Sequence, residues 1–152
     1  MTGVFVKPPD QSVSVANVTD GASTTALLAE WVVGTGVKDT GDELSLTYNT
    51  PNLRLGSEFE QFVQTCAAMT SKTSGPLFAE KGEYILRAAL GWSSYNHNLG
   101  INGRSCLNNN SLMEGAWSAG SRHSAGAHAA FVDGHVKFLK ESLALEVWRA
   151  IG

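Results

Sequence analysis

The hydrophobic and polar positions near the end of the chain predict a β-hairpin. Two short segments rich in apolar residues, 128–132 and 135–139, flank the dipeptide Asp133-Gly134, which favours a two-residue type I′ turn with positive φ. In that register His128 would lie opposite Leu139. The first segment is almost continuously apolar and the second alternates, so we expect one inner strand and one half-exposed strand.

Apolar residues at helical spacing predict two helices. Ser57 and Glu60 match a capping box, and the helix that they begin has an apolar face made of Phe59, Phe62, Val63 and Cys66. Ser142 is a suitable N-cap for a second helix over 143–151, whose apolar residues are Leu143, Val147, Trp148 and Ile151. Gly152 stands where such a helix normally stops.

The rest of the chain gives weaker local signals. We expect a strand within residues 1–5, a helix from about 19 to 31, and a short strand at 44–48 inside a polar excursion. Together the elements predict an α+β fold, with a mainly antiparallel sheet that includes the Asp-Gly hairpin, and flanking helices. The length suits a single globular domain over residues 1–152.

Composition excludes several classes of partner. The chain carries a net charge of −3 and its basic residues are scattered singly, so we expect no binding to nucleic acid or to an acidic membrane surface. No window approaches the roughly 18 consecutive apolar residues of a membrane span. The sequence holds no nucleophile elbow and no dinucleotide-binding loop, and we expect neither an enzyme nor a cofactor.

Histidines gather around the predicted hairpin. His123, His128 and His135 lie close in sequence to Asp133, and imidazole and carboxylate are the ligand types of zinc and other transition metals. In the predicted register, however, His128 and His135 are not cross-strand neighbours. The preferred interpretation is that His123 and His128 bond backbone groups and that Asp133 shapes the turn. A metal site is the alternative.

Aromatic residues offer a second candidate site. Trp92, Tyr95, His97 and Trp117 would form a surface for a glycan or small solute if their rings were exposed. Trp117 lies in a glycine-rich segment and is the tryptophan that we expect to be exposed, whereas Trp148 is expected in the core. Packing in the core or at its edge is nevertheless the preferred interpretation for tryptophans in general.

Four segments carry a resemblance to a bacterial family. His123 is followed by nine residues and Asp133-Gly134, and further matches occur at 17–30, at 91–99 and at 145–152. In this order they resemble the prepilin-type, processing-associated H-X9-DG family, a domain of unknown function numbered 1559. The chain has His135 after Asp-Gly, where the family commonly has serine.

The resemblance implies an extracytoplasmic, pilin-like or pseudopilin-like structural protein at the cell surface, which associates with itself or with other surface components. Members typically begin with a charged leader and a long apolar helix, and the start of this chain does not resemble one. We therefore expect a soluble chain that is a fragment, a processed product or a short relative.

Two cysteines, Cys66 and Cys106, offer one possible disulfide. Composition alone leaves a bond and two unpaired thiols equally open. The extracytoplasmic setting that the resemblance implies favours the bond.

Overall fold

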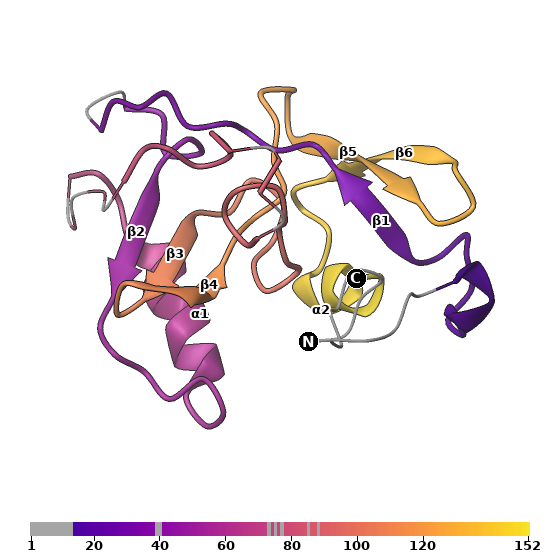
Figure 1. Ribbon diagram of the computed structural model, residues 1–152, viewed down its shortest axis with the longest axis horizontal. Helices are drawn as coiled ribbons and strands as arrows, with labels where there is room; N and C mark the ends of the chain where they lie inside the picture. Colours follow the sequence, from indigo (N-terminus) through magenta and orange to yellow (C-terminus); the bar gives the residue numbers. More distant parts are fainter. Residues whose placement is uncertain are drawn as a thin grey trace.

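The computed structural model describes residues 14–38, 41–72, 74, 76, 78–84, 86–87 and 89–152. The fold is α+β and contains two three-stranded sheets at opposite ends of the long axis (Figure 1). The first sheet consists of β2 (Thr47–Thr50), β3 (Ser105–Asn108) and β4 (Ser111–Ala116), and the second of β1 (Ala26–Ala29), β5 (Gly126–Phe131) and β6 (Val136–Lys140). The strand expected within residues 1–5 lies outside the described residues.

The first sheet is mixed, and one helix packs on it. β2 runs parallel to β3, and β3 runs antiparallel to β4. The strand predicted at 44–48 is found slightly further along the chain, as β2. The helix α1 (Phe59–Ala68) contributes Phe62, Val63 and Cys66 to the buried cluster beneath this sheet.

A disulfide joins α1 to β3. Cys66 and Cys106 are bonded and both are completely buried. The pairing that the resemblance favoured is therefore confirmed, and the alternative of two unpaired thiols is wrong.

The start of α1 differs from the predicted capping box. Glu58, not Ser57, is the N-cap residue. The Glu58 carboxylate accepts a hydrogen bond of 2.7 Å from the backbone N–H of Arg54. The N-terminal turn is thus held by a bond to the preceding loop, which the local sequence pattern did not reveal.

The second sheet contains the predicted hairpin in a different register. β5 is its central strand, and the strand order is β1-β5-β6. His128 pairs with Phe138, one residue away from the predicted partner. The backbone N–H of Phe131 donates to the carbonyl of His135 at 2.9 Å, which closes a three-residue loop. Among the described residues of this loop, Gly134 alone has a positive φ, of 90°, so the type I′ prediction is wrong and the longer turn with one left-handed residue is formed.

The helix predicted over 19–31 is wrong. The segment turns at Gly21, whose φ is 96°, and continues as β1, which pairs antiparallel with β5. The hydroxyls of Thr24 and Thr25 each donate to the carbonyl of Gly21 at 3.0 Å. Such local bonds compete with helix formation, and β5 supplies a strand partner that the periodicity did not show. A short 3-10 helix, η1 (Val15–Asn17), precedes the turn.

The C-terminal helix is shorter than predicted. α2 (Leu145–Ala150) begins after Ala144, so Ser142 is not its cap. Trp148 is buried as expected, whereas Val147 is exposed, contrary to its predicted place on the apolar face.

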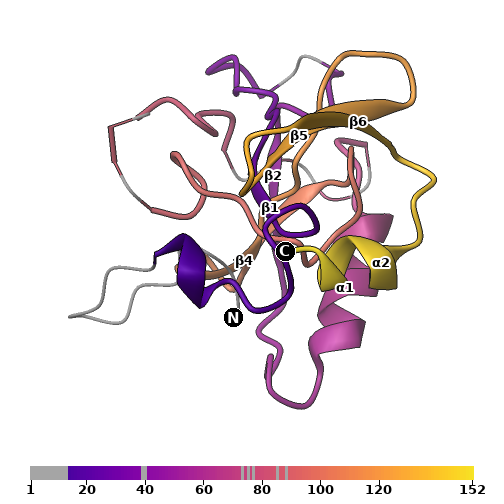
Figure 2. The same cartoon turned by 90° about the vertical axis from the view of Figure 1, so that its right-hand side faces the viewer.

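Contacts of α2 join the two halves of the molecule. Leu145 packs against both buried clusters, one beneath each sheet. Arg149 forms an ion pair of 2.9 Å with Glu60 of α1. In Figure 1, α2 lies below the second sheet and α1 lies to the left, against the first sheet, and in Figure 2 both helices lie below the β5–β6 hairpin. The second sheet and its loops are therefore held in a defined place, where the candidate site lies.

Candidate functional site

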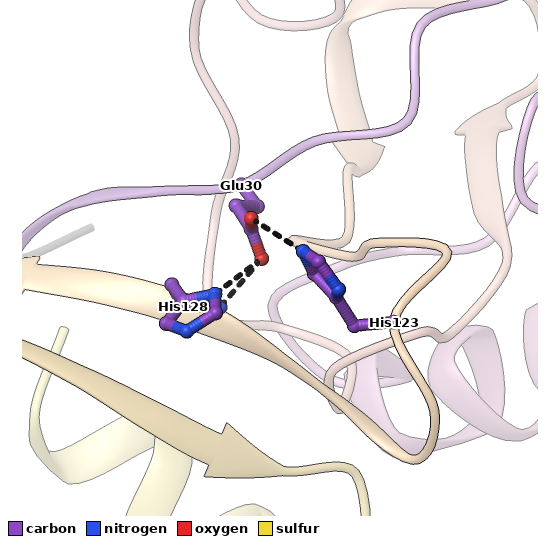
Figure 3. A group of neighbouring side chains, drawn as sticks. All are labelled: Glu30, His123 and His128. Carbon is purple, nitrogen blue, oxygen red and sulfur yellow. Dashed lines mark hydrogen bonds and ion pairs between the residues drawn. The ribbon is translucent and has the colours of Figure 1, made fainter.

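Three ionisable side chains from separate segments meet beside the second sheet (Figure 3). Glu30 directly follows β1, His128 lies on β5, and His123 lies in the turn before β5. Glu30 Oε1 is 3.3 Å from His123 Nε2, and Glu30 Oε2 is 3.2 Å from His128 Nδ1. One donor atom from each residue lies within 4.8 Å of the other two.

Backbone hydrogen bonds hold this group in place. The N–H of Glu30 donates to the carbonyl of His128 at 3.0 Å, which extends the β1–β5 pairing. The N–H of His128 donates to Glu30 Oε2 at 2.7 Å. The N–H of His123 donates to the hydroxyl of Ser121, and that hydroxyl donates to the carbonyl of Gly126 at 2.7 Å. The two histidines and the carboxylate are therefore anchored through their own main chains.

The electrostatics of the group favour an ionised carboxylate. The hydrogen bond from the His128 backbone N–H, assisted by the two imidazoles, lowers the pKa of Glu30 below its ordinary value of 4.5. All three side chains remain partly open to solvent, His123 the most. The group can thus offer one anionic oxygen and two imidazole nitrogens to a cation.

The hairpin loop holds a second, separate pair. Asp133 Oδ1 lies 2.6 Å from His135 Nδ1 and also accepts the backbone N–H of His135 at 3.1 Å. The backbone bond lowers the pKa of Asp133. This is the turn-shaping role expected for Asp133.

The four predicted metal ligands therefore do not form one group. His123 and His128 come together with Glu30, while Asp133 and His135 pair with each other. Pairing with Phe138 places His128 in the middle of β5, away from the loop. Sequence reasoning missed Glu30 as a site residue, although it ends the segment 17–30 that carried part of the resemblance.

The sequence profile of the DUF1559 family, described as a protein of unknown function, matches residues 2–146. The chain belongs to this family. Comparisons with curated proteins and with solved structures find no match. Among the described residues of this DUF1559 chain, no helix has both the length and the apolar character needed to cross a membrane.

The predicted aromatic site is divided in the DUF1559 chain. Tyr95 and His97 stack with Trp148 beside α2, and the rings of His97 and Trp148 have centroids 3.8 Å apart. Trp117 is 0% exposed, so the expectation that it is accessible is wrong. Its ring packs against Phe78 and Trp31 in the interior, where it cannot offer a face to a ligand.

Trp92, one of the four predicted aromatic residues, lines an open cavity at the surface of the described structure. The cavity has a volume of about 290 Å³, and its lining consists of Phe78, Glu80, Glu83, Tyr84 and Trp92. The rings of Tyr84 and Trp92 meet edge to face with centroids 4.9 Å apart. The exposed lining of this space is mostly apolar, and aromatic rings supply much of it.

Proposed function

We propose that this chain is a non-enzymatic, extracytoplasmic structural protein of pilin-like or pseudopilin-like character, which works by self-association. The buried Cys66–Cys106 bond supports the location, because disulfides persist in oxidising compartments. Charged residues make up 16% of the chain, below the usual quarter or so, which suits a protein whose surface contacts other copies.

The observation that carries the proposal is the exposed surface of β6. This strand is the outer strand of its sheet, and an outer strand offers backbone groups to another chain. Val136 is 62% exposed and Phe138 is 39% exposed. Through the register of the sheet, Val136 and Leu28 both lie opposite Ala130, and Leu28 is 57% exposed. An apolar row therefore crosses the outer face.

The sequence of β6 favours a second copy as the occupant. Antiparallel pairing of two β6 strands about a twofold axis at Phe138 would place the two phenylalanines side by side. Each Val136 would then lie opposite Lys140 of the other copy, and each Lys137 opposite Leu139. This register avoids like charges in opposition and creates an aromatic pair, both of which stabilise cross-strand pairing.

Two charge substitutions on β6 test the proposal by sedimentation equilibrium. Phe138→Lys places two lysines directly opposite each other at the twofold axis, and we expect association to weaken at least about tenfold. Val136→Glu also replaces an apolar residue with a charge, but places a carboxylate opposite Lys140, so association is expected to persist. Leu86→Lys alters a residue that is 97% exposed elsewhere and serves as the control.

Each result has a distinct meaning. A wild-type chain that stays monomeric at all concentrations contradicts self-association. Equal weakening by Phe138→Lys and Val136→Glu contradicts the twofold register, and no effect of either contradicts the β6 surface.

The cavity at Trp92 favours a second candidate function, a glycan-binding module. Indole and phenol faces stack on the apolar faces of sugar rings, and Trp92 and Tyr84 supply such faces in this mostly apolar cavity. Titration with neutral oligosaccharides, followed by tryptophan fluorescence, tests this. Trp92→Ala should abolish the response, whereas Tyr95→Phe, in the separate stack on Trp148, should leave it unchanged.

A further inference from the structure

We propose that Glu30, His123 and His128 bind one divalent transition-metal ion of the zinc type. One donor atom from each of the three side chains lies within 4.8 Å of the others. The residues come from the end of β1, from β5 and from the turn before β5, so one ion would join three segments of the chain (Figure 3).

The spacing of the donor atoms fits such an ion. Zinc bonds of about 2.0–2.2 Å to nitrogen and oxygen in tetrahedral geometry place neighbouring donor atoms about 3.3–3.5 Å apart. His123 Nε2 lies 3.3 Å from Glu30 Oε1 and His128 Nδ1 lies 3.2 Å from Oε2, the other oxygen of the same carboxylate. One ligand atom from each of the three side chains lies within 4.8 Å of the other two, so the three atoms need to move only slightly closer to reach this spacing. Binding therefore requires the ion to replace two existing contacts, with small side-chain movements.

The backbone arrangement reduces the cost of forming the site. Glu30 and His128 exchange two hydrogen bonds that involve their main chains, of 3.0 and 2.7 Å. His123 is fixed through Ser121, whose hydroxyl accepts the His123 N–H at 3.0 Å. Ligands that are held before the ion arrives lose little conformational entropy on binding.

The donor set and its exposure define the type of site. Two imidazoles and one carboxylate suit zinc, copper or nickel, whereas calcium and magnesium prefer sites made of oxygen atoms. Three protein ligands leave a fourth tetrahedral position open. Because all three side chains are partly exposed, that position would face solvent and take water or a small anion.

The pair at the hairpin loop provides a matched control. Asp133 and His135 are a carboxylate and an imidazole in close contact, as in the proposed site, but the described structure supplies no third ligand beside them. A metal that binds any exposed carboxylate–histidine pair would respond equally to changes at both places.

The experiment is a calorimetric titration of the full chain, without a histidine tag, with ZnCl2, and a parallel titration with CaCl2. The variants are Glu30→Gln, His123→Ala and His128→Ala, with His135→Ala as the control. His123 lies in a turn and is mostly exposed, so its variant is expected to fold, and far-ultraviolet circular dichroism checks all of them. Absorption of bound Co²⁺ gives a second reading of ligand geometry.

We expect one zinc ion per chain and no calcium binding. Loss of a residue that only hydrogen-bonds to a metal ligand lowers metal affinity about 10–100-fold. Removal of a ligand itself should therefore weaken zinc binding at least tenfold in the three site variants. His135→Ala should bind like the wild type. Absence of zinc binding, one ion per two chains, or equal weakening by His135→Ala would overturn the proposal.

Discussion

The Nδ1 atom of His97 lies 2.7 Å from the carbonyl oxygen of Trp148. Their rings stack, and the side chain of Trp148 is buried beneath the second sheet. Burial lowers the pKa of His97 below its ordinary value of 6.5, although the bond to Trp148 opposes this shift. The neutral imidazole is therefore part of the packing around α2.

This burial predicts a loss of stability in acid. Because the folded state holds the proton less tightly than the unfolded state, the stability linked to His97 is present above pH 6.5 and falls as pH is lowered towards the folded pKa. His97→Gln should be less stable at neutral pH and less sensitive to pH between 7 and 5. Urea unfolding across this range measures both effects. The exposed His135→Gln is the control, and equal pH slopes in wild type and His97→Gln would contradict the prediction.

The burial of Lys81 predicts that stability also depends on pH in the alkaline range. Its ammonium group is buried, donates to the carbonyl of Leu44 and lies 5.5 Å from the ring centre of Trp31. Burial lowers the pKa of Lys81 from 10.5 to about 8, and the charge of Asp42 partly offsets this.

Between these two values the unfolded state binds the proton more readily, so stability linked to Lys81 rises with pH. From pH 8 to 10 the gain is expected to be about 2–3 kcal/mol. Lys81→Met should flatten this part of the profile in urea unfolding. A wild-type stability that falls from pH 8 to 9 would argue against the buried ammonium.

The Cys66–Cys106 bond predicts a large contribution to stability. The two residues are 40 positions apart, and closing a loop of that length restricts the unfolded chain by about 4 kcal/mol in the chain-entropy model. The double variant Cys66→Ala/Cys106→Ala should lose about 3–4 kcal/mol of unfolding free energy in a denaturant titration. Because both sulfurs are buried, reductant should act on the wild type only when denaturant is present. Rapid reduction of the folded protein would contradict this placement.

Any side chain at position 91 is expected to destabilise the fold. Gly91 has a φ of 82°, and an added Cβ would lie 2.6 Å from the ring of Trp117. Gly134 has a φ of 90° but open space around it. A substitution there therefore measures the cost of the backbone conformation without a steric contact. Gly134→Ala should cost about 1–2 kcal/mol through its backbone alone, and Gly91→Ala about 1–3 kcal/mol more through overpacking. Thermal unfolding of both variants measures the difference, and equal costs would show that the contact with Trp117 is easily relieved.

The sequence predicts two residues of the candidate site but not the third. His123 and His128 were recognised because they are histidines near a predicted hairpin. Glu30 was not, because no spacing pattern connects it to a partner such as His128, which is 98 positions away. The same limit explains Trp117, whose glycine-rich surroundings predict exposure, although rings from distant segments cover it.

By itself the sequence determined the elements whose signals lie in neighbouring residues. These are the helix α1 with its apolar face, the hairpin at Asp133-Gly134 and the buried Trp148, together with membership of the family. Only the tertiary structure decided that residues 26–29 form a strand, that the hairpin register shifts by one residue, and that Glu30 meets two histidines. The physical reason is that strand pairing and side-chain convergence depend on partners far along the chain, whereas turns and helical faces are set by local geometry.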